Sequence, residues 1–140
     1  MSPEEIAART AELIKREDRA SRWLGFELEE VRPGYARMAM RVAEHMVNAQ
    51  NVCHGGLVFA LADSSFGYAC NTHNQRSLAA SCAIEFLAPA RAGDRLIAEA
   101  SEVGRAGRSA VYDVRVINQE RQTIALFRGK AAIVKGHWIQ

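Results

Sequence analysis

The chain has few cysteines, little net charge and no long apolar run. Eighteen basic residues against sixteen acidic ones leave a formal net charge of +2, and nucleic-acid-binding domains usually carry a strong basic excess. The longest purely apolar run, residues 55–62, falls far short of the ~18 residues that a membrane span needs. Three cysteines, Cys53, Cys70 and Cys82, are an odd number without paired spacing, as in reduced intracellular proteins. These absences predict a cytoplasmic protein with no nucleic-acid partner and no membrane span.

Length and composition predict one globular domain over residues 1–140. Hydrophobic residues make up 49% of the chain and charged residues 24%, which excludes intrinsic disorder. At roughly 100–200 residues per domain, 140 residues leave no room for a second one. The chain begins with an acidic segment, residues 2–5 (SPEE), and therefore resembles neither a secretory signal nor a transit peptide.

An N-terminal helix is expected over about residues 2–20. Ser2 can cap it and Pro3 suits the first helical position. Its apolar stripe is thin, which indicates a helix on the surface of something larger. The helix is expected to end near Ser21, because residues 23–26 (WLGF) indicate the entry to a strand.

One long helix and several strands are expected after it. Residues 55–71 are apolar at nearly every helical angle, which predicts a buried helix. Residues 35–42 alternate with period 2, the pattern of a half-buried antiparallel strand. Short turns separate four further candidate strands, at about 77–89, 96–103, 110–116 and 123–134. The pattern predicts an α+β fold, in which an antiparallel meander packs against one buried helix.

Asp63 interrupts the apolar helix. Carboxylates are almost never fully buried without a partner, because their desolvation costs several kcal/mol. A catalytic base is one reason to keep such a group, since burial also raises its pKa toward the working pH. The alternatives are a buried carboxylate satisfied by the hydroxyls of Ser64 or Ser65, or one that faces a wet groove.

The predicted start of the same helix carries Cys53-His54-Gly55-Gly56. Glycines let a backbone approach a ligand closely, and free N–H groups at a helix start stabilise developing negative charge. The alternative is a tight turn that needs glycine only for its dihedral angles. Gly55 and Asp63 are eight residues apart, or about 12 Å along a helix. One reacting carbonyl must lie about 3 Å from both, so a shared site requires Gly55 from one subunit and Asp63 from its partner.

Other patterns are weaker. The chain has no nucleophile elbow and no dinucleotide fingerprint. Cys70 and His73 could share a helix face, but zinc sites usually need more ligands, so no metal is expected. Arg105 and Arg108 lie in a glycine-containing turn, where they form either a phosphate site or a solvated hairpin tip.

Taken together, these residues resemble the hotdog-fold acyl-CoA thioesterases, most closely those of the PaaI type that act on phenylacetyl-CoA in bacterial phenylacetate degradation. The resemblance runs from about residue 23 to 133, and its most specific parts are residues 48–66 (NAQNVCHGGLVFALADSSF), 67–71, 111–113 and 126–130. His-Gly-Gly with an Asp eight residues after the first Gly is a specific pattern of the family. The resemblance implies an antiparallel sheet wrapped round one long helix, dimers joined edge to edge, and usually a homotetramer.

The resemblance also implies roles for site residues. Asp63 would be the general base that activates water, or a nucleophile that forms an anhydride, and the Gly55 amide would polarise the thioester carbonyl. Asn48 and His54 match positions that orient the water or the substrate. Some relatives have an auxiliary serine at the position of Ala79. Ser64, Ser65 or Ser81 are the candidates to replace it.

The implied substrate is phenylacetyl-CoA or a hydroxylated aryl-acetyl-CoA, and no metal or redox cofactor is needed. Phe59 and Phe66 would suit an aromatic acyl group, although core packing is equally compatible with them. Ser64 is a candidate for contact with the substrate, and Arg105 and Arg108 would hold the coenzyme A phosphates. Two alternatives stay open: a thioesterase for aliphatic acyl-CoAs, and a non-catalytic acyl-CoA-binding protein.

Overall fold

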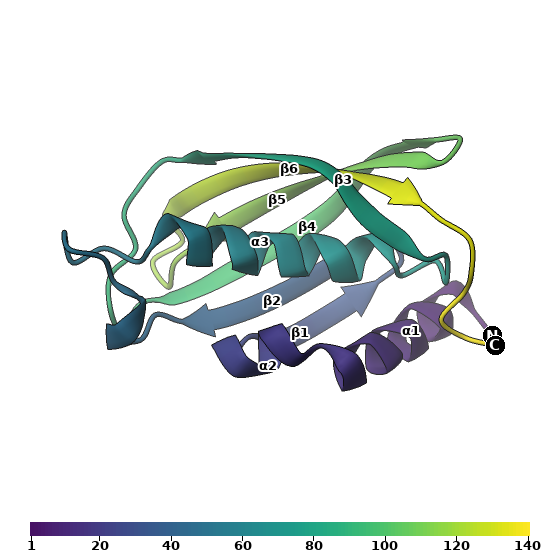
Figure 1. The fold of residues 1–140 in the computed structure, drawn as a ribbon, viewed down its shortest axis with the longest axis horizontal. Helices are drawn as coiled ribbons and strands as arrows, with labels where there is room; N and C mark the ends of the chain where they lie inside the picture. Colours follow the sequence, from purple (N-terminus) through teal and green to yellow (C-terminus); the bar gives the residue numbers. More distant parts are fainter.

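A curved sheet wraps around one helix in the computed structural model, which describes residues 1–140 (Figure 1). All six strands are antiparallel, in the order β1-β2-β4-β5-β6-β3. The strands are β1 (Glu27–Arg32), β2 (Tyr35–Arg41), β3 (Ser77–Phe86), β4 (Arg95–Ala106), β5 (Ser109–Ile117) and β6 (Thr123–Ile133). The helices are α1 (Pro3–Glu17), α2 (Arg19–Leu24) and α3 (Gly55–Cys70), with a 3-10 turn at Glu44–Met46. This is the predicted α+β hotdog fold.

Helix α3 fills the hollow of the sheet. Its apolar residues Val58, Leu61, Ala62 and Phe66 are almost completely buried, as expected for a helix without a polar face. Facing them are Ala36, Met38 and Met40 on β2, together with alternate residues of β4 and β5. Small residues on both surfaces allow the close approach of helix and sheet.

The strands form a meander only in part. β4, β5 and β6 are consecutive neighbours, but β3 does not pair with β4. It crosses to the far edge of the sheet and pairs with β6, with Cys82 opposite Gly129. The prediction of a simple meander was wrong here, because alternation within a strand defines its faces and not its neighbour.

Two helices stand where the sequence predicted one. α1 begins with a capping box between Ser2 and Glu5, as Ser2 and Pro3 predicted. The chain then turns at Asp18, whose carboxylate accepts a hydrogen bond of 3.1 Å from the Ser21 N–H and so caps α2. α2 continues to Leu24 and ends at Gly25, which has φ of 76°. Residues 23 and 24 are therefore helical, and the predicted strand entry there was wrong.

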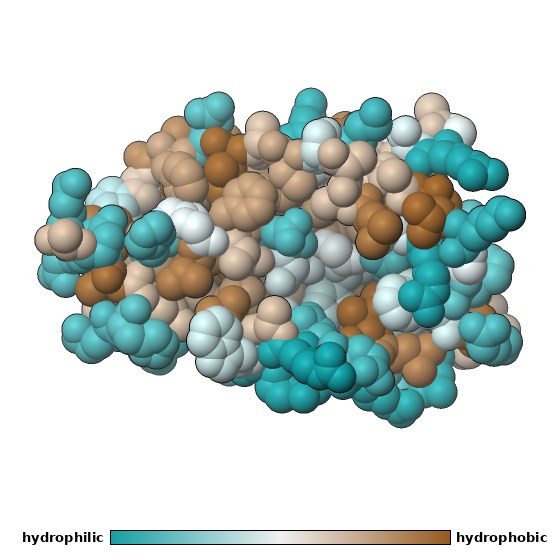
Figure 2. All heavy atoms as spheres, viewed as in Figure 1, coloured by the Kyte–Doolittle hydropathy of each residue, from teal (hydrophilic) through white to brown (hydrophobic).

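Strand β3 is an open edge with an apolar surface. Leu78, Phe86 and the following Leu87 are exposed by 64%, 53% and 60%. In Figure 2 apolar side chains gather along the upper part of the molecule, where Figure 1 shows β3 and α3. An unpaired edge with exposed apolar residues can add another strand. None of the helices has the length and apolarity that crossing a membrane requires.

Candidate active site

Asp63 lies on α3 as a half-buried carboxylate without a partner. It accepts no hydrogen bond and forms no ion pair within the chain. Burial raises the pKa of Asp63 above its ordinary value of 3.8. The carboxylate keeps its hydrogen-bonding capacity for a ligand or water.

The two serines that follow Asp63 form hydrogen bonds to other elements of the fold. Ser64 Oγ shares a hydrogen bond of 3.2 Å with Ser21 Oγ on α2. Ser65 Oγ donates to the carbonyl oxygens of Ala36 and Ala98, each at 3.0 Å, and so ties α3 to β2 and β4. The alternative that these hydroxyls satisfy Asp63 was wrong. Of the three serine candidates, only Ser81 has a hydroxyl without a partner in the chain; it is exposed on β3.

The start of α3 presents free backbone donors. His54 is the N-cap residue, is exposed, and makes no side-chain capping bond. The N–H groups of Gly55 and Gly56 have no acceptor in the chain, as is usual for the first turn of a helix. A Cβ on Gly55 would lie 3.1 Å from Cζ of Phe86, so a ring at the end of β3 packs closely against this glycine.

A mostly apolar hollow of about 380 Å³ adjoins these donors. Asn48 and Gly55 lie on its wall with Phe86, Leu87 and Ile124. Oδ1 of Asn48 accepts hydrogen bonds from the N–H groups of Gln50 at 2.9 Å and Val52 at 3.2 Å. Asn48 therefore shapes the loop that leads to α3, and its amide nitrogen makes no hydrogen bond within the chain.

Gly55 and Asp63 belong to one uninterrupted helix. Eight residues at the usual helical rise separate them by about 12 Å along its axis. A single thioester carbonyl cannot contact both groups of the same chain. The structure thus retains the geometry from which the sequence predicted a site shared between subunits.

The two phenylalanines differ in position. Phe59 is half-buried and packs edge-to-face on Phe127, with the ring centroids 5.4 Å apart. Phe66 is only 1% exposed, and its ring lies against Tyr112 and Phe127. A Cβ on Gly129 would come within 2.9 Å of the Phe66 ring. The expectation that Phe66 contacts substrate was wrong, because the ring is locked in the core.

Arg105 and Arg108 share a small basic hollow. It measures about 250 Å³ and also contains Lys135 and Gln75. Arg105 donates to Oε1 of Gln75 at 2.6 Å and lies 3.5 Å from the carboxylate of Glu102. Lys135 was missed in the sequence, since the end of the chain meets the β4–β5 turn only in the folded protein.

A partly buried polar network lies near the C-terminal end of α3. Oε1 of Glu102 accepts hydrogen bonds from the Tyr112 hydroxyl at 2.7 Å and pairs with Nε2 of His73 at 3.1 Å. His73 is thus paired with Glu102, and the metal pair that the sequence suggested with Cys70 is not formed. No group of three or more His, Cys, Asp or Glu side chains could hold a metal ion.

Burial raises the pKa of Cys70 to about 12, and the charge of Asp63 contributes to this shift. Burial and Asp63 also raise the pKa of Cys82 on β3. Both thiols therefore stay protonated at neutral pH. All three cysteines are unpaired.

Residues 50–125 match the family model of the thioesterase superfamily. The chain belongs to the thioesterase superfamily. It is 38% identical over 130 residues to the acyl-coenzyme A thioesterase PaaI of Escherichia coli (strain K12), an alignment that covers 93% of each chain. It is also 35% identical to a putative esterase of Archaeoglobus fulgidus, over 89% of this chain and 81% of the relative.

Solved structures of the superfamily agree with this membership. The E. coli PaaI protein from the phenylacetic acid degradation operon superposes with a TM-score of 0.95 and 37% identity, covering 97% of this chain and 99% of that one. A PaaI from Thermus thermophilus reaches a TM-score of 0.81 with 34% identity over 84% of this chain and all of the other. The protein is thus a thioester hydrolase with the hotdog fold and a close homologue of PaaI, which confirms the predicted family and enzyme class.

Proposed function

We propose that this thioesterase hydrolyses aryl-acetyl-CoA, with phenylacetyl-CoA or a ring-hydroxylated relative as its substrate and the free acid and coenzyme A as products. The observation that carries the proposal is Asp63, a half-buried carboxylate that no group of its own chain satisfies. The names of its PaaI relatives support the substrate class. No cofactor takes part, because a thioester is already activated toward attack by water.

Asp63 acts as the general base. It takes a proton from a water molecule while the water oxygen attacks the thioester carbonyl carbon. The carbonyl oxygen gains negative charge, which the N–H of Gly55 from the partner subunit stabilises. When the tetrahedral intermediate collapses, the carbon–sulfur bond breaks and the coenzyme A thiolate leaves, and the proton held by Asp63 passes to the thiolate, which restores the base. Attack by the Asp63 carboxylate itself, through an anhydride, would use the same placement.

The polar groups around this centre orient the reactants. Asn48 lies at the wall of the hollow beside Gly55, and its free amide nitrogen can donate to the substrate or to the attacking water. His54 is exposed at the start of α3, within reach of a bound thioester. Phe59, half-buried on α3, remains a candidate wall for the aromatic acyl group.

A dimer completes the site. The apolar open edge of β3 supports pairing with the same strand of a second copy, which extends the sheet across both subunits. The two α3 helices then lie antiparallel, and Asp63 of one chain can approach Gly55 of the other. We infer that two such dimers associate as a homotetramer and that the enzyme, with its three unpaired cysteines, works in the cytoplasm.

The coenzyme phosphates fit the basic hollow. Arg105, Arg108 and Lys135 supply three cations within one surface depression, and phosphate oxygens favour such groups. Gln75, which borders this hollow, follows the end of α3 by five residues, so the cations lie beyond the C-terminal end of the helix that carries Asp63. An extended coenzyme A arm could therefore run from the reacting carbonyl to these cations.

Thiol release from a panel of acyl-CoAs tests the proposal. Asp63→Asn should lower kcat with phenylacetyl-CoA by more than about 100-fold, because the base is lost while the volume is kept. The variant should also unfold at an equal or higher temperature at pH 7, since an unpaired half-buried charge has been removed. Wild-type turnover by Asp63→Asn would exclude the assigned base. Faster turnover of aliphatic thioesters by the wild-type enzyme would keep the mechanism and exclude the aryl-acetyl substrate.

A further inference from the structure

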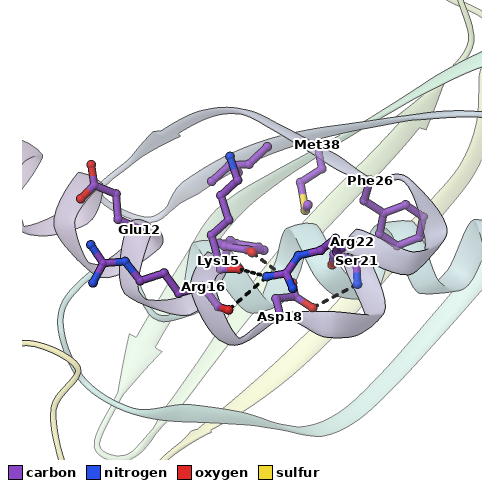
Figure 3. A pocket seen from close by; sticks show the side chains of 10 residues that line it. Glu12, Lys15, Arg16, Asp18, Ser21, Arg22, Phe26 and Met38 are labelled. Carbon is purple, nitrogen blue, oxygen red and sulfur yellow. Dashed lines mark hydrogen bonds between the residues drawn. The ribbon is translucent and has the colours of Figure 1, made fainter.

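A third hollow, separate from the proposed thioesterase site and from the basic hollow, lies between the N-terminal helices and the sheet (Figure 3). We call it the N-terminal hollow; it measures about 410 Å³, a size usual for small-molecule sites. Its floor is apolar and consists of Phe26, Met38 and Tyr68, all three buried, with Leu28 beside them. Neither Asp63 nor Gly55 borders it.

The carboxylates around the N-terminal hollow are already paired. Asp18 accepts hydrogen bonds from the Ser21 N–H at 3.1 Å and from the Tyr68 hydroxyl at 3.0 Å. Glu12 forms an ion pair of 3.3 Å with Arg9, outside the hollow. Lys15, Arg16 and Arg22 outnumber the two carboxylates by one, so the rim keeps an excess of positive charge.

The basic side chains of the rim have hydrogen-bond donors that are not used within the chain. Arg22 uses one nitrogen, which donates to the carbonyl oxygens of Lys15 at 3.4 Å and Arg16 at 3.1 Å (Figure 3). The side chains of Lys15 and Arg16 have no hydrogen-bond or ion-pair partner in the chain. A rim of unpaired cations above an apolar floor is complementary to an anion with an apolar body.

The N-terminal hollow is also connected to the catalytic helix. Ser21, on its wall, is hydrogen bonded at 3.2 Å to Ser64, the residue after Asp63. Tyr68, on its floor, belongs to α3 and is bonded to Asp18 at the start of α2. A ligand that moves α2 would therefore act on α3 next to the catalytic carboxylate.

We propose that the N-terminal hollow binds a monocarboxylic acid with an apolar or aromatic body, and that binding there slows the enzyme. The acid released from the substrate belongs to this class, so the identity of the natural ligand rests on the proposed function, whereas the existence of the site does not. The carboxylate would meet Lys15, Arg16 and the remaining donors of Arg22, and the apolar body would cover Phe26 and Met38.

Calorimetric titration of the full-length protein with sodium phenylacetate and sodium octanoate tests the site directly. The Asp63→Asn variant serves as the host, so that binding does not depend on turnover. The double variant Lys15→Gln/Arg16→Gln should weaken binding at least 10-fold. Arg19→Gln should leave it unchanged, because Arg19 is an exposed cation of α2 outside the hollow. The neutral phenylacetamide should bind at least 10-fold more weakly than phenylacetate.

Kinetics then separate this site from the active site. In the wild-type enzyme the acid should lower kcat even at saturating thioester, and Lys15→Gln/Arg16→Gln should abolish that effect while leaving the uninhibited rate unchanged. The proposal would be overturned if the double variant bound the acid as tightly as the host protein, or if the inhibition were purely competitive. A lower oligomer mass in the double variant would also overturn it, because a second copy of the chain would then be the occupant. If the wild-type protein binds the acid but hydrolyses none of the thioesters, that result would count against the proposed function and not against this site.

Discussion

The Asp63 carboxylate lies where it is poorly solvated and has no counter-charge nearby. Its raised pKa means that the protonated form is favoured in the folded state relative to the unfolded chain. The stabilisation from this preference is complete below the unfolded pKa and is lost as the pH rises through the folded pKa. At neutral pH the folded protein therefore carries the full cost of an ionised Asp63, as expected of a functional rather than a structural carboxylate.

The pH profile of hydrolysis should show this shift. A general base works only when ionised, so kcat/KM should fall as the pH drops through the pKa of Asp63. Because burial raises that pKa, the midpoint of the acid limb should lie above 3.8. Rates from about pH 4 to 8, with stability checked by circular dichroism at each pH, give the measurement. A profile that stays flat down to pH 4 would be incompatible with a half-buried base.

Single residues could be assigned from sequence where their chemistry conflicts with their surroundings. Asp63 is such a case, since a carboxylate in the middle of an apolar helix is conspicuous in the sequence itself. Phe66 is the opposite case, because phenylalanine occurs both in cores and in binding pockets. Only the packing of Phe66 on Tyr112 in the folded protein distinguishes a core position from a pocket position. Lys135 could not be found, since its approach to Arg108 depends on the tertiary fold.

At the scale of the element, a substitution at the start of α3 can remove the N–H donor of Gly55 without breaking the helix. Gly55 is the first helical residue, a position that suits proline, and His54 has φ of −57° and ψ of 129°, which a following proline tolerates. Gly55→Pro removes the proposed oxyanion donor, so kcat should fall by about 10²–10³. Gly55→Ala introduces the same Cβ near the half-exposed Phe86 but keeps the N–H, so it should lose far less. Equal losses in the two variants, measured by thiol release, would assign the effect to the Cβ.

The packing of α3 on β6 depends on a second glycine. A Cβ at Gly129 would lie 2.9 Å from three atoms of the Phe66 ring, and that ring is buried among Tyr112 and Phe127. Gly129→Ala should lower the free energy of unfolding by about 1–3 kcal/mol through overpacking. Gly104→Ala is the matched control, because a Cβ at this strand glycine meets nothing within 4 Å. Denaturant unfolding of both variants measures the difference, and similar values would contradict a locked Phe66.

Elements were predictable from the sequence where local pattern and tertiary demand agree. Residues 55–71 predicted α3 almost to the residue, because no other element accommodates so long an apolar run rich in alanine. α2 was missed, since its formation depends on the Asp18 cap and on the left-handed conformation of Gly25. The place of β3 at the sheet edge was also missed, because the pairing partner of a strand is a long-range property.

In the whole molecule, the open edge of β3 and the separation of the two proposed catalytic groups lead to the same assembly. A lone chain exposes Leu78, Phe86 and Leu87 and leaves Asp63 without an oxyanion donor opposite it. Antiparallel pairing of two β3 strands would cover these apolar side chains and would bring the partner's oxyanion donor opposite Asp63. The dimer predicted from the Gly55–Asp63 spacing alone therefore gains support from an unrelated feature of the surface.

Mixed dimers test this arrangement of the whole molecule. In a dimer of one Asp63→Ala chain and one Gly55→Pro chain, one site combines both defects and the other combines both intact groups. After equal amounts of the inactive homodimers exchange subunits at random, half of the dimers are mixed, so activity should rise to about a quarter of the wild-type value. Exchange is verified by native mass spectrometry of chains carrying different tags. If mixed dimers form and stay inactive, each chain must complete its own site, and the separation of about 12 Å along α3 must then be bridged within one subunit.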